Sequence, residues 1–184
     1  MNKISAGTAA GPGESLKLYT PDGQAEPLSV RWFDGYWWLS LPKLQTIPVA
    51  VPTWTQIAFS QEPTRAAVAG EVDGYLVLEF DQKTPLAMLQ VDIGQICRNS
   101  ARAVIATQSG DTDFDFRLRY FAPQYGVNED AVTGSAQRVL ADYWSRRGDS
   151  FRVLQSSAAG GVILVRSHGN VVDIGGRVSS DSSF

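Results

Sequence analysis

Short apolar stretches, separated by turn sequences, constrain the fold of this chain more than any other feature. Residues 28–33 and 36–41 flank Asp34-Gly35, a pair that supplies the positive φ of a tight hairpin. Further stretches typical of β-strands occur at 16–19, 65–69, 75–80, 101–107, 114–121, 151–155, 161–166 and 170–174.

Helical patterns are fewer. Residues 53–61 favour a short helix, and residues 85–96 place Leu86, Leu89, Ile93 and Ile96 on one helical face. The clearest helix begins near Gly134 or Ser135 and ends at Arg146-Arg147-Gly148, a basic and glycine stop. Its apolar stripe consists of Ala136, Val139, Leu140, Tyr143 and Trp144. Because strands and helices do not alternate regularly, we expect an α+β protein with a largely antiparallel or mixed sheet.

Composition limits the class of protein. The 184 residues include 43% apolar and 19% charged residues, enough for a sizeable core in one domain, or one domain and part of another. A net charge of −3 argues against a nucleic-acid partner, and the short apolar runs argue against a membrane partner. The N-terminus has no secretory signal, and a single cysteine excludes an internal disulfide. We therefore expect a cytoplasmic protein.

Asn128-Glu129-Asp130-Ala131-Val132-Thr133-Gly134-Ser135 is the segment that most favours chemistry. The first N–H groups of a helix are unpaired and carry partial positive charge, so they can hold a substrate carboxylate. A neighbouring acid could then transfer a proton. Acidic and hydroxyl residues before a helix are also typical of capping, and the residues alone favour capping over a site. The residues alone leave both interpretations open.

Other candidates carry less weight. Cys97 is interpreted as a small, buried or half-buried apolar residue, because no Cys/His arrangement supports a nucleophile. His168 belongs to a turn, and the sequence predicts no metal site. Asp111, Asp113 and Asp115 have an approximate calcium spacing, but the glycine and closing glutamate of such a loop are missing.

The run RYFAPQYGVNEDAVTGSAQRVLADYW, followed by QSSAAGG, resembles the C-terminal lobe of the PhzF (phenazine biosynthesis-like) isomerase family. The family is similar in fold to diaminopimelate epimerase. Its usual pattern is Arg-x-Phe-x-Pro, then Glu-Asp-Pro-x-Thr-Gly-Ser-Ala, a helix with a Tyr-Trp pair, and a Gln-x-Ser-x-Arg-Gly-Gly turn. Weaker similarity extends from Leu16 to Val178.

The resemblance implies two lobes, each a barrel-like sheet around a central helix, with the site between them. It also implies isomerisation or epimerisation of a small carboxylic acid by proton transfer without a cofactor. The family's aspartate corresponds to Asp130, which would orient the substrate or assist proton transfer. Thr133, Gly134 and Ser135 would bind its carboxylate.

This sequence also departs from the family pattern. We expect it to lack the first-lobe segment that carries the catalytic glutamate and a Cys-Gly-His-Ala-Thr-like motif, so that the principal acid/base would be absent. Ala131 replaces the usual proline, Gln137 the usual histidine, and Ala159 the usual arginine. The alternatives are therefore an isomerase completed by another chain, a catalytically inactive binding or interaction module, or a shortened product with no role.

The expected organisation follows from the same comparison. Residues 1–15 would form a loose N-terminus, 16–45 the remaining strands of a truncated first lobe, 46–178 a complete second lobe, and 179–184 a frayed tail. The last strands could return to the first lobe. Trp32, Trp37 and Trp38 would leave that first-lobe sheet in need of cover, so the sequence predicts a homodimer in which these strands pair or exchange.

Overall fold

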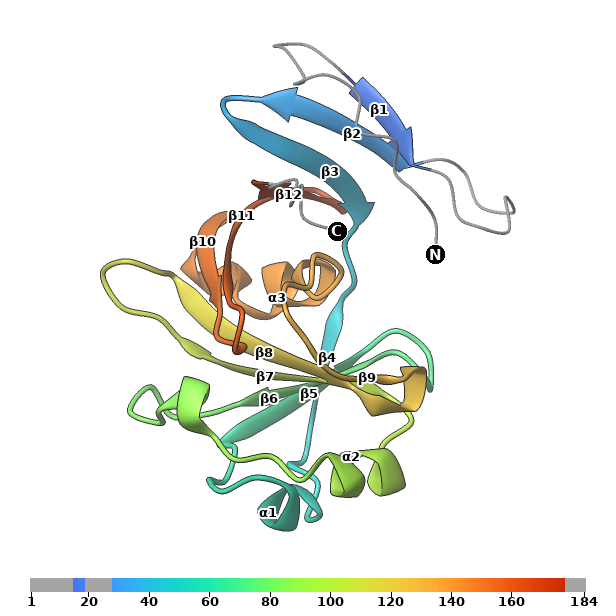
Figure 1. The fold of residues 1–184 in the computed structure, drawn as a ribbon, viewed down its shortest axis with the longest axis vertical. Coiled ribbons are helices and arrows are strands. Elements are labelled where there is room, and N and C mark those ends of the chain that lie inside the picture. Colours follow the sequence, from blue (N-terminus) through green and yellow to red (C-terminus); the bar gives the residue numbers. More distant parts are fainter. Residues whose placement is uncertain (1–14, 19–27, 178–184) are drawn as a thin grey trace, which may run out of the picture.

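The computed structural model describes residues 15–18 and 28–177, and within them one mixed β-sheet organises the molecule (Figure 1). Ser15 is thus the only described residue of the predicted loose N-terminus, and the predicted tail 179–184 lies outside the described residues. The strands are β1 (Ser15–Leu18), β2 (Leu28–Phe33), β3 (Tyr36–Pro42), β4 (Thr46–Val49), β5 (Arg65–Ala69), β6 (Tyr75–Glu79), β7 (Ala103–Ser109), β8 (Phe116–Ala122), β9 (Val127–Asp130), β10 (Ser150–Gln155), β11 (Gly161–His168) and β12 (Val171–Gly176). The helices are α1 (Thr55–Ala58), α2 (Ile93–Asn99) and α3 (Gln137–Tyr143), with 3-10 turns η1 (Leu86–Met88), η2 (Pro123–Tyr125) and η3 (Ser145–Arg147).

The sheet confirms the α+β prediction. Its order is β1-β2-β3-β12-β11-β10-β8-β7-β6-β5-β4, and β9 pairs with β8 at the side of this path. The β6–β7 and β8–β10 pairings are parallel, and the other described pairings are antiparallel. The sheet curls around α3 (Figure 1), but β1 and β4 stand at opposite ends of its order, so the barrel-like sheet does not close.

Two apolar cores lie on opposite faces of this sheet. One packs α3 against strands β5 to β8 and β10 to β12, with Val139, Leu140 and Val153 fully buried. The other packs α1, η1 and α2 against the reverse face around Leu78 and Ile96. The central strands are therefore covered on both sides, which explains why they read as continuous apolar runs rather than as alternating ones.

The predicted hairpin turn is confirmed. Asp34 and Gly35 both have positive φ (54° and 79°), and Phe33 pairs with Tyr36 across them. Such a turn matches the right-handed twist of its two strands, β2 and β3.

The prediction of one continuous helix over residues 85–96 is wrong, although leucine and isoleucine residues expected on its apolar face are buried. Leu86 and Leu89 are buried beside Ile96, but η1 ends at Met88 and Val91 forms a bridge with Phe59. Regular helix begins only after Asp92, whose side chain caps it by accepting from the Gln95 N–H (3.0 Å). An N-cap residue needs extended backbone, so Asp92 interrupts the predicted helix.

The start of the predicted second lobe contains a strand. Thr46–Val49 is β4 and pairs with β5, so the prolines flank and interrupt a strand at the end of the sheet. β3 pairs along its length with β12, which joins residues 36–42 to the last strand of the chain. The division into lobes at residue 46 stays a prediction.

Candidate active site

The loop between β9 and α3 carries the acidic and glycine residues of the sequence motif. β9 ends at Asp130, and regular helix begins at Gln137. The first helical turn starts earlier, because the Gln137 N–H donates to the Gly134 carbonyl (3.0 Å) and the Arg138 N–H to that of Ser135 (3.2 Å). The predicted start near Gly134 or Ser135 therefore agrees with this first turn.

Glu129 and Asp130 point in opposite directions, because successive side chains of a strand face opposite sides of the sheet. Glu129 forms a two-point ion pair with Arg119: Nε to Oε1 is 2.7 Å and Nη2 to Oε2 is 2.8 Å. The remaining Arg119 nitrogen donates to the Leu89 carbonyl (2.6 Å). Glu129 therefore anchors the segment around η1 to β8.

Asp130 has a different environment. Its Oδ2 accepts a hydrogen bond from the Thr133 hydroxyl (2.6 Å), and among the described residues it forms no salt bridge. The carboxylate is half-buried and lies on the α3 side of the sheet, opposite Tyr120 in the pairing of β8 with β9. Asp130 is thus the member of the acidic pair that is free to act on a ligand.

Gln155 holds this loop in place. Its fully buried side chain accepts from the Thr133 N–H (2.7 Å) and donates to the Asp130 carbonyl (2.7 Å) and the Thr133 hydroxyl (3.1 Å). Thr133 is consequently occupied by hydrogen bonds inside the protein. Gln155 is the first residue of the QSSAAGG run, and the sequence alone predicted no role for it.

Two of the next three residues leave donors available, because Gly134 and Ser135 are partly exposed whereas Ala136 is fully buried. The backbone N–H groups of Gly134, Ser135 and Ala136 have no hydrogen-bond acceptor among the described residues. They precede α3, where the peptide dipoles favour negative charge. Gly134 has no side chain in the way of an approaching ligand. Two accessible, unpaired N–H donors at the start of a helix make a suitable seat for an anion.

The Gly160-Gly161 turn packs against the loop between β9 and α3. A side chain on Gly161 would overlap Val132, because its Cβ would lie 2.4 Å from Val132 Cγ2. The Ser157 hydroxyl donates to the Ala131 carbonyl (2.7 Å) and accepts from the Gly160 N–H (3.0 Å). The family's glycine turn is therefore a platform for the acidic loop rather than a phosphate-binding loop.

Tyr120 is a second residue that sequence reasoning missed. Burial, reinforced by the nearby Tyr75, Asp130 and Tyr125, raises the pKa of Tyr120 to about 12. Its hydroxyl therefore stays protonated at neutral pH, next to Asp130. The sequence shows only an aromatic residue in an alternating strand pattern, which does not predict a raised pKa or a position near Asp130.

The other candidates have local partners. His168 Nε2 contacts Asp173 Oδ2 (2.8 Å). The prediction that Cys97 is buried or half-buried is wrong: Cys97 is exposed, because α2 turns the neighbouring Ile96 toward the core instead. Asp111 accepts from the backbone N–H groups of Asp113 and Phe114, and from Arg117, so it shapes a turn. In the described ranges, the structure contains no group of three or more His, Cys, Asp or Glu side chains placed to hold a metal.

Comparison with known proteins identifies the family. Residues 42–177 match the family model described as phenazine biosynthesis-like protein (PhzC-PhzF), and the chain belongs to this family. An uncharacterized isomerase of Pseudomonas aeruginosa is 34% identical over 168 residues, which cover 90% of this chain and 62% of that protein. A phenazine biosynthesis-like domain-containing protein of Bos taurus is 51% identical over 67 residues, covering 34% of this chain and 23% of the relative. The chain thus spans less than two thirds of these relatives.

Solved structures give the same fold. A PhzF family protein of Enterococcus faecalis superposes with a TM-score of 0.81 at 27% identity, covering 91% of this chain and 63% of that one. A predicted epimerase of Pseudomonas aeruginosa superposes with a TM-score of 0.53 at 18% identity, covering 92% and 65%, a likeness of fold alone. None of the helices described in this chain is long and apolar enough to cross a membrane.

Proposed function

We propose that this chain carries the carboxylate-binding half of a PhzF-like isomerase site, which isomerises or epimerises a small carboxylic acid without a cofactor. The observation that carries the proposal is the pair of unpaired, partly exposed N–H groups of Gly134 and Ser135 near the Asp130 carboxylate. Family membership supplies the reaction class, and the loop supplies a place for a carboxylic acid substrate.

The substrate carboxylate would accept hydrogen bonds from the N–H groups of Gly134 and Ser135, with the Ser135 hydroxyl as a further donor. Asp130 would face the substrate, and orient it or assist proton transfer. Thr133 keeps Asp130 in position through its hydroxyl (2.6 Å). Movement of a proton from one carbon atom to another requires a positioned base and a positioned acid.

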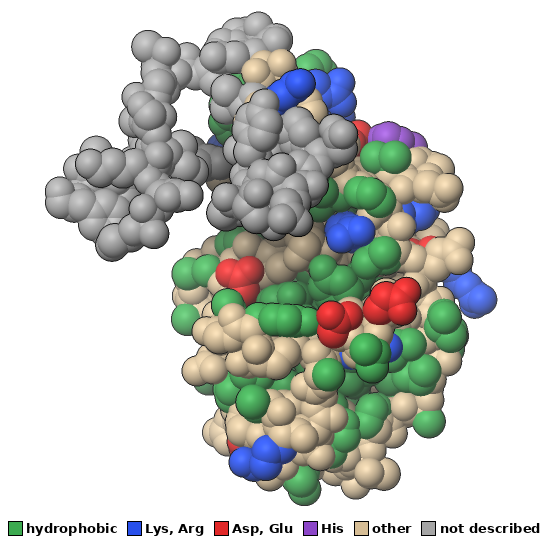
Figure 2. Space-filling view, turned by 90° about the vertical axis from the view of Figure 1, so that its right-hand side faces the viewer, with side chains coloured by type: hydrophobic (Ala, Val, Ile, Leu, Met, Phe, Trp, Pro, Cys, Tyr) green, Lys and Arg blue, Asp and Glu red, His purple; other side chains and the backbone are tan. Residues whose placement is uncertain are grey.

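The second acid/base group would come from outside the described residues. Glu129 is held by Arg119, and His168 by Asp173, so neither serves Asp130. Exposed apolar side chains surround the loop: Val127 (40% exposed), Val132 (46%) and Val162 (43%). The β9 end of the sheet is seen head-on in Figure 2, where apolar side chains occupy much of the surface with acidic side chains among them. A second lobe covering this surface would complete the site and exclude water.

Deuterium exchange tests the activity. The chain, with a panel of small carboxylic acids in D₂O, is expected to introduce deuterium at a carbon-bound position, detected by proton NMR. Asp130→Asn should lower the rate by about a hundredfold or more, the usual contribution of a proton-transferring group. Asp73→Asn, a change of the same kind at an exposed turn, should leave it unaltered. Absence of exchange with every acid, alone or with added cell extract, would contradict the proposal.

The alternative is a binding or interaction module that keeps the loop without catalysis. Asp130 makes a hydrogen bond with Thr133 and with no second titratable group among those described, which favours this alternative. It predicts that carboxylates raise the melting temperature of the chain, with no deuterium incorporation. If neither carboxylates nor a captured protein alters the melting temperature, the module has no ligand and this alternative fails.

We further propose that the chain self-associates through the β1–β3 region. Trp32 and Trp37 pair across β2 and β3 with ring centroids 5.4 Å apart, and both are only partly buried. Apolar aromatic surface of this kind favours contact with another chain. Light scattering at micromolar concentration is expected to give the mass of a dimer, and a monomer mass would contradict this proposal.

A further inference from the structure

A cavity of about 320 Å³ lies on the face of the sheet that points away from α3. It is lined by Arg31, Trp32, Phe33, Trp38, Arg166 and Asp173. Val172 and Ile174, which alternate with Asp173 along β12, are buried in the core around α3. Since alternate residues of a strand face opposite sides, the sheet itself separates this cavity from that core.

The Trp38 side chain forms one wall of the cavity and is held in a fixed position. Its ring lies against the bare backbone of Gly175, where an added Cβ would be 2.9 Å from three ring atoms. The indole N–H donates to the Phe33 carbonyl (3.1 Å), and the side chain is only 6% exposed. Only glycine at position 175 allows this close approach.

Arg166 is stacked on the outer side of the same ring, with its Cζ 4.1 Å from the ring centroid. A stacked guanidinium loses little further freedom when its N–H edge binds an acceptor. Arg31 lies on β2, opposite Trp38 in the pairing of β2 with β3, and its guanidinium also lines the cavity.

Neither guanidinium is neutralised by a direct contact. The side chains of Arg31 and Arg166 form no hydrogen bond or salt bridge with any residue in the described part of the chain, whereas those of Arg117 and Arg119 are paired with carboxylates. Asp173 also lines the cavity, opposite Arg166 in the pairing of β11 with β12 and near enough to Arg31 for their charges to interact. Its two oxygens, however, are occupied by the Ser40 hydroxyl (2.5 Å) and by His168 Nε2 (2.8 Å). The guanidinium donors therefore remain available.

We propose that this cavity binds a small anionic ligand through Arg31 and Arg166, which hold its carboxylate or phosphate group, while Phe33 contacts an apolar body. Guanidinium groups match the planar geometry and charge of such anions. The volume is that of a small-molecule site. Phe33, which is 61% exposed, supplies apolar surface at the rim.

Phenyl phosphate, inorganic phosphate and benzamide serve as probes in calorimetric titrations of the full chain. Phenyl phosphate is expected to bind more tightly than inorganic phosphate, because the ring adds apolar contact, and neutral benzamide is expected not to bind. Arg31→Gln and Arg166→Gln should each weaken phenyl phosphate binding by about tenfold or more. Arg166→Lys, which keeps the charge but loses the flat fork, should give an intermediate affinity.

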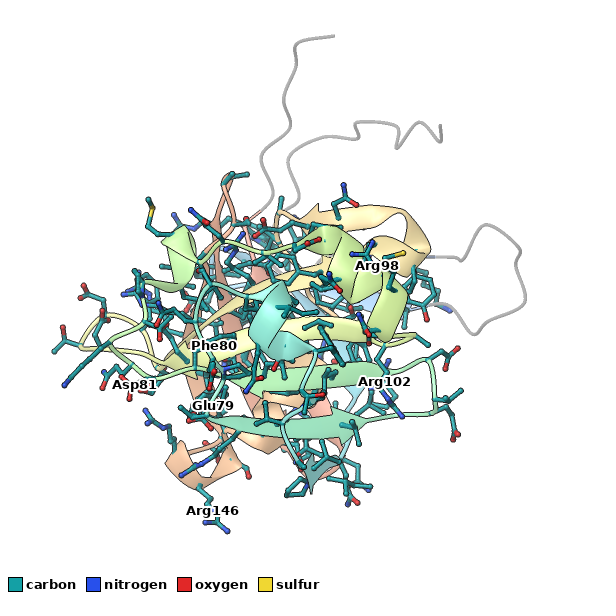
Figure 3. All side chains as sticks on the ribbon, turned by 90° about the horizontal axis from the view of Figure 1, so that it is seen from below. Glu79, Phe80, Asp81, Arg98, Arg102 and Arg146 are labelled. Carbon is teal, nitrogen blue, oxygen red and sulfur yellow. The ribbon has the colours of Figure 1, made fainter. Side chains whose placement is uncertain are left out.

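Arg98→Gln is the matched control, because Arg98 lies on α2, among the helices on the underside of the molecule (Figure 3), whereas β2 and β3 lie at the opposite end (Figure 1). Its binding should equal that of the unaltered chain. Circular dichroism establishes that each variant is folded. Equal affinity in the folded Arg31→Gln and Arg98→Gln variants would overturn the proposal, as would binding of phosphate and benzamide with equal affinity.

Nitrogen-15 NMR separates this cavity from the proposed active site. Phenyl phosphate should shift the indole N–H resonance of Trp38 before it shifts the backbone amides of Gly134 and Ser135. Shifts confined to Gly134 and Ser135 would show that the anion binds only at the active-site loop, and would overturn the proposal while leaving the isomerase proposal standing.

Discussion

At the scale of single residues, two neighbouring acids have opposite roles. The sequence motif pointed to Asp130, and the pairing of β9 explains why Glu129 cannot act beside it, because Glu129 faces Arg119 on the other side of the sheet. Arg119 is 11% exposed in its side chain and also holds the Leu89 carbonyl, so this ion pair fixes one end of the site.

Arg119→Ala should destabilise the chain by about 3 kcal/mol, because it leaves a partly buried carboxylate and a carbonyl group without partners. Urea unfolding measures the change. Arg65→Ala is the control: Arg65 is 75% exposed and lies 3.7 Å from Glu79, so its loss should cost less than about 1 kcal/mol. Equal effects of the two substitutions would contradict this assignment.

Gln155→Leu keeps the side-chain volume but removes the hydrogen bonds to Thr133 and Asp130. Two buried backbone groups would be left unpaired, so we expect a loss of about 2 to 4 kcal/mol in unfolding free energy. Amide hydrogen exchange should accelerate at Thr133 more than in β10. A variant as stable as the original chain would show that Gln155 does not hold the loop.

These residues also show which parts of the candidate site could be predicted from the sequence and which could not. Asp130, Gly134 and Ser135 were predicted as site residues from their motif, because the types and spacing of these residues resemble those of the PhzF family. Gln155 and Tyr120 act through burial and through partners distant in the chain, Thr133 for one and Asp130 for the other. Such roles depend on tertiary packing, which no local pattern encodes.

At the scale of elements, the turn between β10 and β11 positions the acidic loop by contact. Gly161 packs against Val132, and Ser157 holds the Ala131 carbonyl. The strands and the hairpin turn were predictable because β-branched runs and Asp-Gly pairs act locally. The 85–96 segment was not, because Asp92 caps α2 and the pairing of Val91 with Phe59 extends the chain where periodicity favoured helix.

Gly161→Ala should lower the unfolding free energy by about 1 to 3 kcal/mol, since the new methyl group would overlap Val132. The double variant Gly161→Ala with Val132→Ala should recover most of this loss, because the smaller side chain vacates the space. Urea unfolding of the four proteins forms a complete cycle. Strictly additive changes in unfolding free energy would mean that the side chains at positions 161 and 132 do not clash.

At the scale of the whole molecule, the sheet has two unequal ends. On β4 the Thr46 N–H is taken by Asp142 (2.8 Å), and Pro48, two residues further on the same edge, has no N–H. This edge therefore offers few donors to another strand. We expect association to use the β1–β3 end instead.

Trp37→Ser should shift the proposed dimer toward monomer, because it removes apolar surface from one face of β3. Phe33→Ser is the control: it removes an exposed ring from β2 on the opposite face of the hairpin and should leave the mass unchanged. Light scattering over a dilution series measures both. Dissociation by Phe33→Ser with no effect of Trp37→Ser would place the contact on the other face.

The central claim is that residues 130–136 form a carboxylate seat beside Asp130, whether or not this chain alone completes the reaction. Titration of the nitrogen-15-labelled chain with small carboxylic acids tests it most directly. We predict saturable shifts of the Gly134, Ser135 and Ala136 amides, with altered affinity in Asp130→Asn. Amides that stay unshifted while the acids bind elsewhere, or do not bind, would contradict the account.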